Sequence, residues 1–211
     1  MDDGKIKKIA AEILRNKDRA FRILDYLRPE DIERGVLALP DELWNDELQD
    51  IILDRCAPYL AGYQLTSASG GNGSGGPDGL LFLDLDLRIK QLGGLRARYM
   101  FSISHLQFSG VQRRLAFSYR EDVKCLGNPL QSMALKALLG DKTLLMKAAE
   151  MAGLTASNRS SRLGPIVAAD RERAVVDLSR LNLPLPGFLD VLHITYQGAG
   201  DGFLRFLFHV S

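Results

Sequence analysis

The sequence predicts an α+β protein with a twisted antiparallel sheet, helices on one face of that sheet, and an N-terminal helical segment before it. From Gly62 onward, apolar and polar residues alternate at every second position, most clearly over residues 81–89, as on strands with one buried face. Before Gly62, and again after Asn128, apolar residues recur at helical spacing. We therefore expect a helical segment at residues 1–61 and an α+β domain at residues 62–211, packed together or forming a single domain.

Composition narrows the class of protein. The 211 residues are 46% hydrophobic and 25% charged, as in ordinary globular proteins, and the net charge of +1 gives no general attraction to nucleic acid. The two cysteines, Cys56 and Cys125, are far apart and have no metal-like spacing. We find no signal-peptide pattern and no run of about 20 apolar residues. These features predict a cytoplasmic protein with free thiols, no transmembrane segment and no nucleic-acid partner.

Residues 4–60 predict three helices. The first carries Ile6, Ile9 and Ile13 on one face, and the second ends at Pro29. The third places Pro40 in its first turn, where the missing N–H of proline does no harm. We expect this segment to be helical throughout.

A first strand at residues 63–66 leads into a stretch rich in glycine and serine, residues 67–79. This stretch fits a hairpin loop inside one domain or a hinge between two domains. We favour the hairpin, because the strand at residues 63–66 otherwise has no partner.

The two strands that follow predict a register from turn chemistry. A three-residue connection at residues 91–93, with glycine last, is a favoured hairpin turn. It places Leu85 opposite Tyr99 on one face, and Asp86 opposite Arg98 on the other. Apolar residues then share one face and complementary charges share the other.

A third strand at residues 111–124 pairs with the second if Tyr99 lies opposite Tyr119. The alternation slips after Ile103, which predicts a β-bulge near His105. Between residues 80 and 124 we expect odd-numbered side chains to turn inward and even-numbered ones to meet water.

A helical hairpin follows the sheet strands. Asn128 is a good N-cap with Pro129 at the first helical position, and Gly140 ends this helix. Asp141 caps a second helix, which ends at Gly153. The rest of the chain predicts two short strands and a terminal hairpin, at residues 166–168, 174–178, 192–196 and 204–210.

One short motif points toward an enzyme. Gly73-Ser74 followed by Asp84 and Asp86 resembles the signature of the polymerase-beta-type nucleotidyltransferases, in which alternate strand carboxylates bind two Mg²⁺ ions. The segment between the two halves should open a helix, but here it is rich in glycine and proline. A loop and an ion pair between Asp86 and Arg98 explain the same residues. We favour the ion pair and expect no catalytic residues.

The other candidates for chemistry are weaker. His193 and His209 lie on one face of the terminal hairpin, but neither they nor His105 has carboxylate or cysteine ligands at metal-binding spacing. We therefore expect no metal and no cofactor. The aromatic residues of the sheet lie on the face opposite its arginines, whereas nucleic-acid-binding sheets mix the two, so we expect no nucleic-acid platform.

The rhythm of residues 166–181, and the order of three strands followed by helices, is similar to the bacterial small members of the tubular lipid-binding superfamily, relatives of bactericidal permeability-increasing protein. The resemblance covers residues 62–211. It implies non-enzymatic binding of a lipid or another hydrophobic ligand in a cavity between the sheet and the helices. The residues that would line this cavity are Tyr99, Phe101, Phe117, Tyr119, Met133 and Leu138. Ordinary core packing explains the same apolar residues.

Three functions therefore stay open. We favour a protein that binds a hydrophobic ligand or lipid without catalysing a reaction. The alternative is a protein-interaction or assembly module that uses its acidic helices or the apolar residues Leu183, Leu185 and Phe188. A metal-dependent nucleotidyltransferase is the third. The sequence leaves the oligomeric state open.

Overall fold

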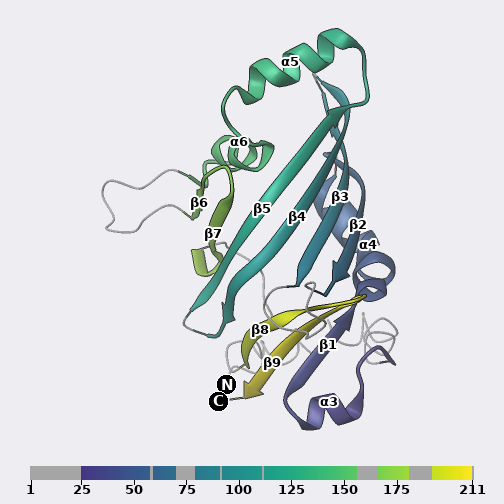
Figure 1. The fold of residues 1–211 in the computed structure, drawn as a ribbon, viewed down its shortest axis with the longest axis vertical. Coiled ribbons are helices and arrows are strands. Elements are labelled where there is room, and N and C mark those ends of the chain that lie inside the picture. Colours follow the sequence, from purple (N-terminus) through teal and green to yellow (C-terminus); the bar gives the residue numbers. More distant parts are fainter. Residues whose placement is uncertain are drawn as a thin grey trace, which may run out of the picture.

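The computed structural model describes residues 25–57, 59–69, 79–90, 92–110, 112–155, 166–180 and 192–210. Within these residues, a large antiparallel sheet and several helices form an α+β fold (Figure 1). The strands are β1 (Val36–Pro40), β2 (Leu60–Ala68), β3 (Leu80–Ile89), β4 (Gly93–Phe108), β5 (Arg113–Cys125), β6 (Val167–Ala169), β7 (Arg173–Asp177), β8 (Leu192–Gly200) and β9 (Phe203–Val210). The helices are α3 (Pro29–Glu33), the π-helix η1 (Leu43–Glu47), α4 (Gln49–Cys56), α5 (Pro129–Leu139), α6 (Leu144–Met151) and the 3₁₀ helix η2 (Leu178–Arg180).

The sheet branches at its longest strand, β4. The strand order is β1-β9-β8-β4-β5-β7-β6, and β3 with its partner β2 also pairs with β4. The first part of β4 pairs with β3, and Gln107 and Phe108 at its end pair with β8. Figure 1 shows the consequence: β2 to β5 run side by side, α5 lies at one end of them, and β1, β8 and β9 lie at the other. The short strands and the terminal hairpin predicted in the last third of the chain are confirmed.

The prediction that residues 4–60 are helical throughout is wrong at β1, and residues 1–24 lie outside the described residues. Residues 36–40 form an edge strand that pairs with β9. Pro40 ends this strand instead of starting a helix, and an edge strand tolerates proline because its free side needs no N–H donor. Helical structure resumes after Pro40 in η1 and α4.

The glycine-rich stretch joins two strands that pair. Ala68 lies opposite Leu80, and the pairing continues toward Leu60 and Leu87 at the other end of β2 and β3. The hairpin interpretation is therefore confirmed for the strands, and the segment between them, residues 70–78, lies outside the described residues.

Both predicted registers are wrong by two residues. Leu85 lies opposite Ala97, not Tyr99, and Tyr99 lies opposite Glu121, not Tyr119. The turn explains the shift in the first hairpin. Gly93 has a left-handed backbone, with φ of 74°, but it already begins β4, and Leu92 before it is buried in the core. A shift of two residues preserves the faces, because side chains alternate with a period of two.

The expected division of faces is present on β4 and β5. Ala97, Tyr99, Phe117 and Tyr119 are buried, whereas the even-numbered Arg96, Arg98, Ser118 and Arg120 are exposed. The predicted bulge is confirmed between Ile103 and His105. We call the two sides of the sheet over β3 to β5 the apolar face and the polar face.

Helices α5 and α6 pack against the apolar face at different heights. Leu135 of α5 contacts the buried Leu92 and Leu95, and Leu144 of α6 belongs to the aromatic cluster of β4 and β5. A third cluster joins Leu81 of β3 to the inner side chains of β8 and β9. The core therefore runs the length of the sheet.

The caps of the two helices are set by side chains. Asn128 caps α5 in a reciprocal capping box with Gln131, as expected. The prediction that Asp141 caps α6 is wrong, because Thr143 holds that position and its hydroxyl accepts the Met146 N–H at 3.2 Å. The Thr143 hydroxyl is within 2.7 Å of the Tyr119 hydroxyl, which ties the start of α6 to the sheet.

Candidate functional site

The four aromatic residues expected to line a cavity lie together on the apolar face. Tyr99 stacks on Phe101 with ring centroids 5.5 Å apart, Phe101 meets Phe117 edge-on at 5.2 Å, and Phe117 lies 6.0 Å from Tyr119. These distances are those of aromatic rings in direct contact. The four rings pack directly against one another and in this way stabilise the core.

The hydroxyl groups of this cluster are held in place. Tyr119 donates to the backbone oxygen of Asp170 at 2.6 Å, and burial raises its pKa above the ordinary value. Burial, together with the charge of Glu121, also raises the pKa of Tyr99. Glu121 in turn accepts the Leu144 N–H at the start of α6. Both tyrosines stay neutral at physiological pH and have structural contacts.

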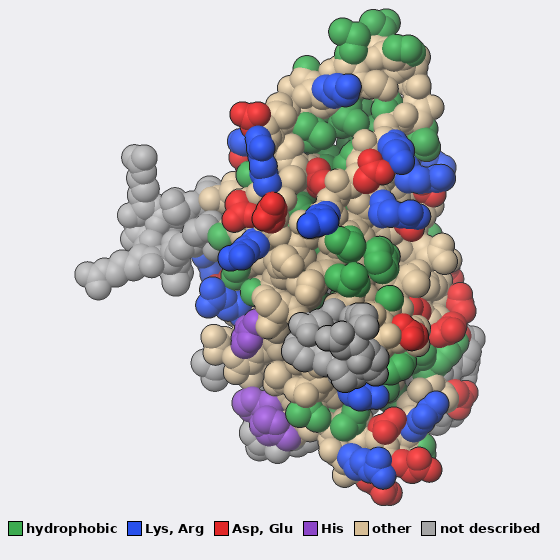
Figure 2. Space-filling view, in the orientation of Figure 1, with side chains coloured by type: hydrophobic (Ala, Val, Ile, Leu, Met, Phe, Trp, Pro, Cys, Tyr) green, Lys and Arg blue, Asp and Glu red, His purple; other side chains and the backbone are tan. Residues whose placement is uncertain are grey.

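The two helix residues of the same prediction lie elsewhere. Met133 is 66% exposed and Leu138 is 38% exposed, both on α5, and neither belongs to the aromatic cluster. Leu130, also on α5, is 74% exposed, and Leu126 just before the helix is 59% exposed. We call these four residues the apolar tip. Figure 2 shows hydrophobic surface gathered at the end of the molecule that α5 forms.

The apolar tip exists because α5 is apolar on nearly all sides. Leu135 turns toward the sheet and is 5% exposed, and Leu139 packs in the same cluster. Leu130 and Met133 lie on the opposite side of the helix, where the spacing of 3.6 residues per turn places them. A helix that buries one apolar side and exposes another offers the exposed side to a partner. The sequence signal is this all-round apolar pattern, whereas the prediction places Met133 and Leu138 in a cavity between the sheet and the helices.

A shallow hollow adjoins the apolar tip. Its lining includes Tyr59, Arg88, Lys90 and Gly94, its volume is about 620 Å³, and most of its surface is apolar. A side chain at Gly94 would lie 3.6 Å from the Leu126 side chain, so the hollow and the tip are neighbours. No described acidic side chain forms an ion pair with Arg88 or Lys90. This end of the molecule thus combines exposed apolar and cationic groups.

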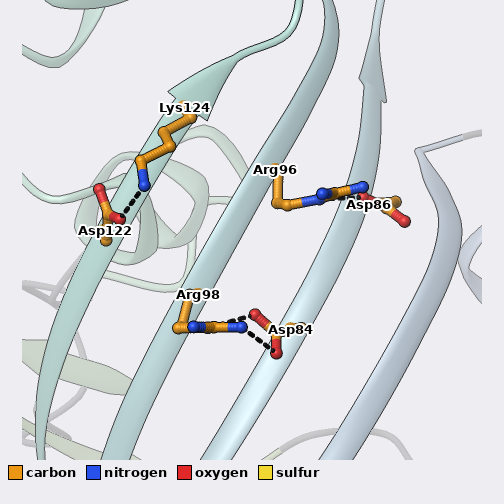
Figure 3. Close-up of polar contacts among 6 residues, drawn as sticks. All are labelled: Asp84, Asp86, Arg96, Arg98, Asp122 and Lys124. Carbon is orange, nitrogen blue, oxygen red and sulfur yellow. Dashed lines mark hydrogen bonds and ion pairs between the residues drawn. The ribbon is translucent and has the colours of Figure 1, made fainter.

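The polar face carries cross-strand ion pairs (Figure 3). Arg98 of β4 binds Asp84 of β3 with two hydrogen bonds, of 2.6 and 3.0 Å, and Arg96 binds Asp86 at 3.0 Å. The predicted pair of Asp86 with Arg98 is therefore wrong, as the register shift requires. Exposed pairs of this kind contribute about 0–1 kcal/mol each.

These ion pairs bear on the nucleotidyltransferase alternative. Asp84 and Asp86 each face an arginine, and the described residues contain no group of three His, Cys, Asp or Glu side chains that could hold a metal ion. Gly73 and Ser74 lie outside the described residues.

His193 and His209 lie opposite each other as expected, with their rings stacked 4.7 Å apart.

A second hollow lies on the polar face, next to the ion pairs. It has a volume of about 370 Å³, and its polar lining includes Ser102, Ser118, Arg120, Arg173 and the acidic Glu172. Arg173 begins β7, directly opposite Ser118. We did not single out these residues from the sequence, because β5 and β7 had no predicted pairing.

Among the helices that the structure describes, none has the length and apolar character needed to cross a bilayer.

Comparisons with known proteins do not assign the chain to a family. No protein-family model matches the sequence, and no curated protein or solved structure matches it either.

Proposed function

We propose that the protein binds lipid or a similar hydrophobic ligand without catalysing a reaction, and that its apolar tip is the surface that contacts a lipid membrane. In this proposal the helices cover only the apolar face of the sheet, and the exposed side of α5 faces outward. The observation that carries the proposal is the exposure of Leu130 and Met133, at 74% and 66%, on a helix whose other side is buried. Exposed apolar residues that gather in one patch often mark a surface that contacts a membrane or another protein.

The charges around the tip indicate which membrane it fits. Arg88 and Lys90 lie beside it, and Lys136 lies on α5 itself. Cations beside an exposed apolar surface complement anionic lipid headgroups, and each contributes about 1 kcal/mol of attraction at a charged membrane. Tyr59, which is 67% exposed beside Arg88, has the ring and hydroxyl that suit the interface between headgroups and acyl chains.

The apolar contribution can be sized from the exposure. Burying a whole Leu or Met side chain is worth about 1.5–3 kcal/mol. Since two-thirds to three-quarters of Leu130 and Met133 is exposed, each offers about 1–2 kcal/mol on entering a membrane interface. A substitution at either position should therefore weaken membrane binding roughly 5- to 30-fold.

Sedimentation with lipid vesicles tests the proposal. We expect the protein to bind vesicles of phosphatidylcholine mixed with phosphatidylserine, more weakly those of phosphatidylcholine alone, and to lose the difference in about 1 M salt, where charges are screened within about 3 Å. Met133→Asp should abolish most binding. Met151→Asp is the matched control, because Met151 is 76% exposed on α6, outside the tip. Equal binding by the two variants would contradict the proposal.

Two other occupants of the tip are distinguished by further measurements. If α5 instead joins two copies of the chain, light scattering will show a dimer that Met133→Asp dissociates. If a lipid sits inside the protein, native mass spectrometry will find it retained in Met133→Asp. The assembly alternative can also use the acidic residues of α3, Glu30, Asp31 and Glu33, whereas the segment with Leu183, Leu185 and Phe188 lies outside the described residues.

A further inference from the structure

Some arginines on the polar side of the sheet form no ion pair with a described carboxylate, and two of them line the same hollow. Arg96, Arg98 and Lys124 each bind an aspartate. No described carboxylate forms an ion pair with Arg120 or Arg173. Both of these arginines line the 370 Å³ hollow on this face. Two positive charges and the negative charge of Glu172 therefore meet at one concave place.

Strand pairing sets the geometry of this hollow. Ser102, Ser118 and Arg173 lie in one row across β4, β5 and β7, because each is directly opposite the next. Met100 and Arg120 form the adjacent row on the same face. Residues related diagonally across strands lie about 7–8 Å apart, so the guanidinium groups of Arg120 and Arg173 can reach one anion from two sides. Ser118 neighbours both arginines, and Ser102 lies on the far side of Ser118 from Arg173, so the two serine hydroxyls are further donors on this face.

The other wall of the hollow is apolar. Leu80 and Met100 line it. A volume of about 370 Å³ is in the range of sites for small molecules, which pair an apolar wall with a few polar groups. A bare inorganic ion would leave the apolar wall unused. The hollow therefore suits an anion attached to a compact apolar group.

We propose that this hollow, the Arg120–Arg173 site, binds a small soluble molecule that carries a phosphate monoester and a compact apolar portion. Two guanidinium groups match the double negative charge of a phosphate monoester, and each can donate two parallel hydrogen bonds to its oxygens. The serine hydroxyls donate to the remaining oxygen. The apolar portion packs on Leu80 and Met100.

The turn before β7 holds Arg173 in position. Asp170 accepts the backbone N–H groups of Glu172 and Arg173 at 2.8 and 2.7 Å. Both bonds end on Oδ1, so the carboxylate keeps its charge; these hydrogen bonds, and then the charge of Arg173, lower the pKa of Asp170. Glu172 is the acidic side chain that lines the hollow, and its charge opposes an anion there. Removal of this charge should strengthen binding.

The site is separate from the apolar tip. Ser118 lies seven residues from Cys125, the end of β5 beside α5, which is about 23 Å along a strand. A membrane-bound apolar helix enters only about 5–10 Å into the headgroup region. The Arg120–Arg173 site thus stays in water when the tip binds a membrane, and its ligand is a soluble molecule and not a lipid headgroup.

Phenyl phosphate is the probe, with binding followed by NMR titration of the ¹⁵N-labelled protein. We expect saturable shifts at residues 100–102 and 118–120. Arg120→Gln and Arg173→Gln should each weaken binding at least tenfold. Arg98→Gln is the matched control. It removes the same charge from the same face, but Arg98 is already bound to Asp84, so this variant should change the affinity less than threefold. Circular dichroism checks that each variant is folded.

Further experiments test which parts of the ligand are bound and whether the ligand is a soluble molecule or a lipid. Inorganic phosphate and phenol should each bind more weakly than phenyl phosphate, and Glu172→Gln should bind phenyl phosphate more tightly. Arg120→Gln should bind vesicles as the unmodified protein does, including vesicles with phosphatidic acid, so the two proposals can fail separately. The proposal is overturned if phenyl phosphate does not bind at millimolar concentration, or if Arg98→Gln weakens binding as much as Arg120→Gln.

Discussion

A buried aspartate–serine contact joins the two branches of the sheet, and its removal should cost far more stability than a similar contact nearby. Asp41, just after β1, accepts both the backbone N–H and the hydroxyl of Ser67 on β2, at 2.6 Å each. Asp41 is 7% exposed and Ser67 is 4% exposed. Asp201 makes the same two contacts with Ser69 at 2.8 and 2.7 Å, but in an exposed position.

The magnitude follows from burial. A hydrogen bond to a charged group contributes about 1.5–3 kcal/mol, and a buried donor left unpaired costs about 1–3 kcal/mol. Asp41→Ala removes two such bonds, but it also removes the cost of desolvating the buried carboxylate. We therefore expect the free energy of unfolding to fall by about 3 kcal/mol. Asp41→Asn keeps one acceptor oxygen and should lose about half as much.

Urea denaturation tests this reasoning, because the midpoint and slope give the free energy of unfolding. The proteins compared are the unmodified chain, Asp41→Ala, Asp41→Asn and Asp201→Ala. Asp201→Ala is the control for the loss of an aspartate that binds a serine twice. Water replaces the carboxylate there, so its loss should be much smaller. If Asp41→Ala and Asp201→Ala lose equal stability, burial does not decide the strength of these contacts, and the argument fails.

Three further predictions concern the core, the close approach of Gly79 to Ala199, and the pH dependence of stability. Leu95→Ala should lower the free energy of unfolding by about 3–4 kcal/mol, because Leu95 is fully buried and its loss leaves a cavity; a loss under about 1 kcal/mol would show that the site collapses. Gly79→Ala should lower the thermal midpoint, because its Cβ would lie 2.5 Å from the backbone oxygen of Ala199, and an unchanged midpoint would contradict this close approach. The hydrogen bonds to Asp170 lower its pKa, so they stabilise the fold above the unfolded value of about 4 and are lost as pH falls through the lower folded value. The stability difference from Asp170→Ala, measured by denaturation across pH, should thus be present at pH 7 and vanish in acid; a pH-independent difference would contradict it.

The faces of the sheet were predictable, because alternation with a period of two survives any error in register that is an even number of residues. The register itself was not, because Gly93 is expected in the turn but pairs with Ile89 at the start of β4. The turn therefore lies one residue earlier than expected, and Leu92 within it is buried against α5. The ion pairs followed the register, so Arg98 binds Asp84 in place of the expected Asp86.

Other features depend on contacts that no local pattern records. The five residues of β1 resemble a short helical stretch until β9 supplies the hydrogen bonds of a strand. The apolar tip was hidden for a related reason: the pattern shows that α5 is apolar, but only the packing of Leu135 shows which side remains in water. The Arg120–Arg173 site requires the pairing of β5 with β7, which are separated in the chain by two helices and β6.

The pairing of β1 with β9 has a consequence for how the chain folds as it is made. Pro40 pairs with Phe203, 163 positions later. A ribosome adds about 5–20 residues per second, so β1 waits roughly ten seconds or more before its partner emerges. During that interval its backbone donors and its apolar side chains have no sheet to join, and a chaperone or a neighbouring nascent chain can capture them. Slowing translation late in the message should therefore lower the yield of folded protein more than slowing it early.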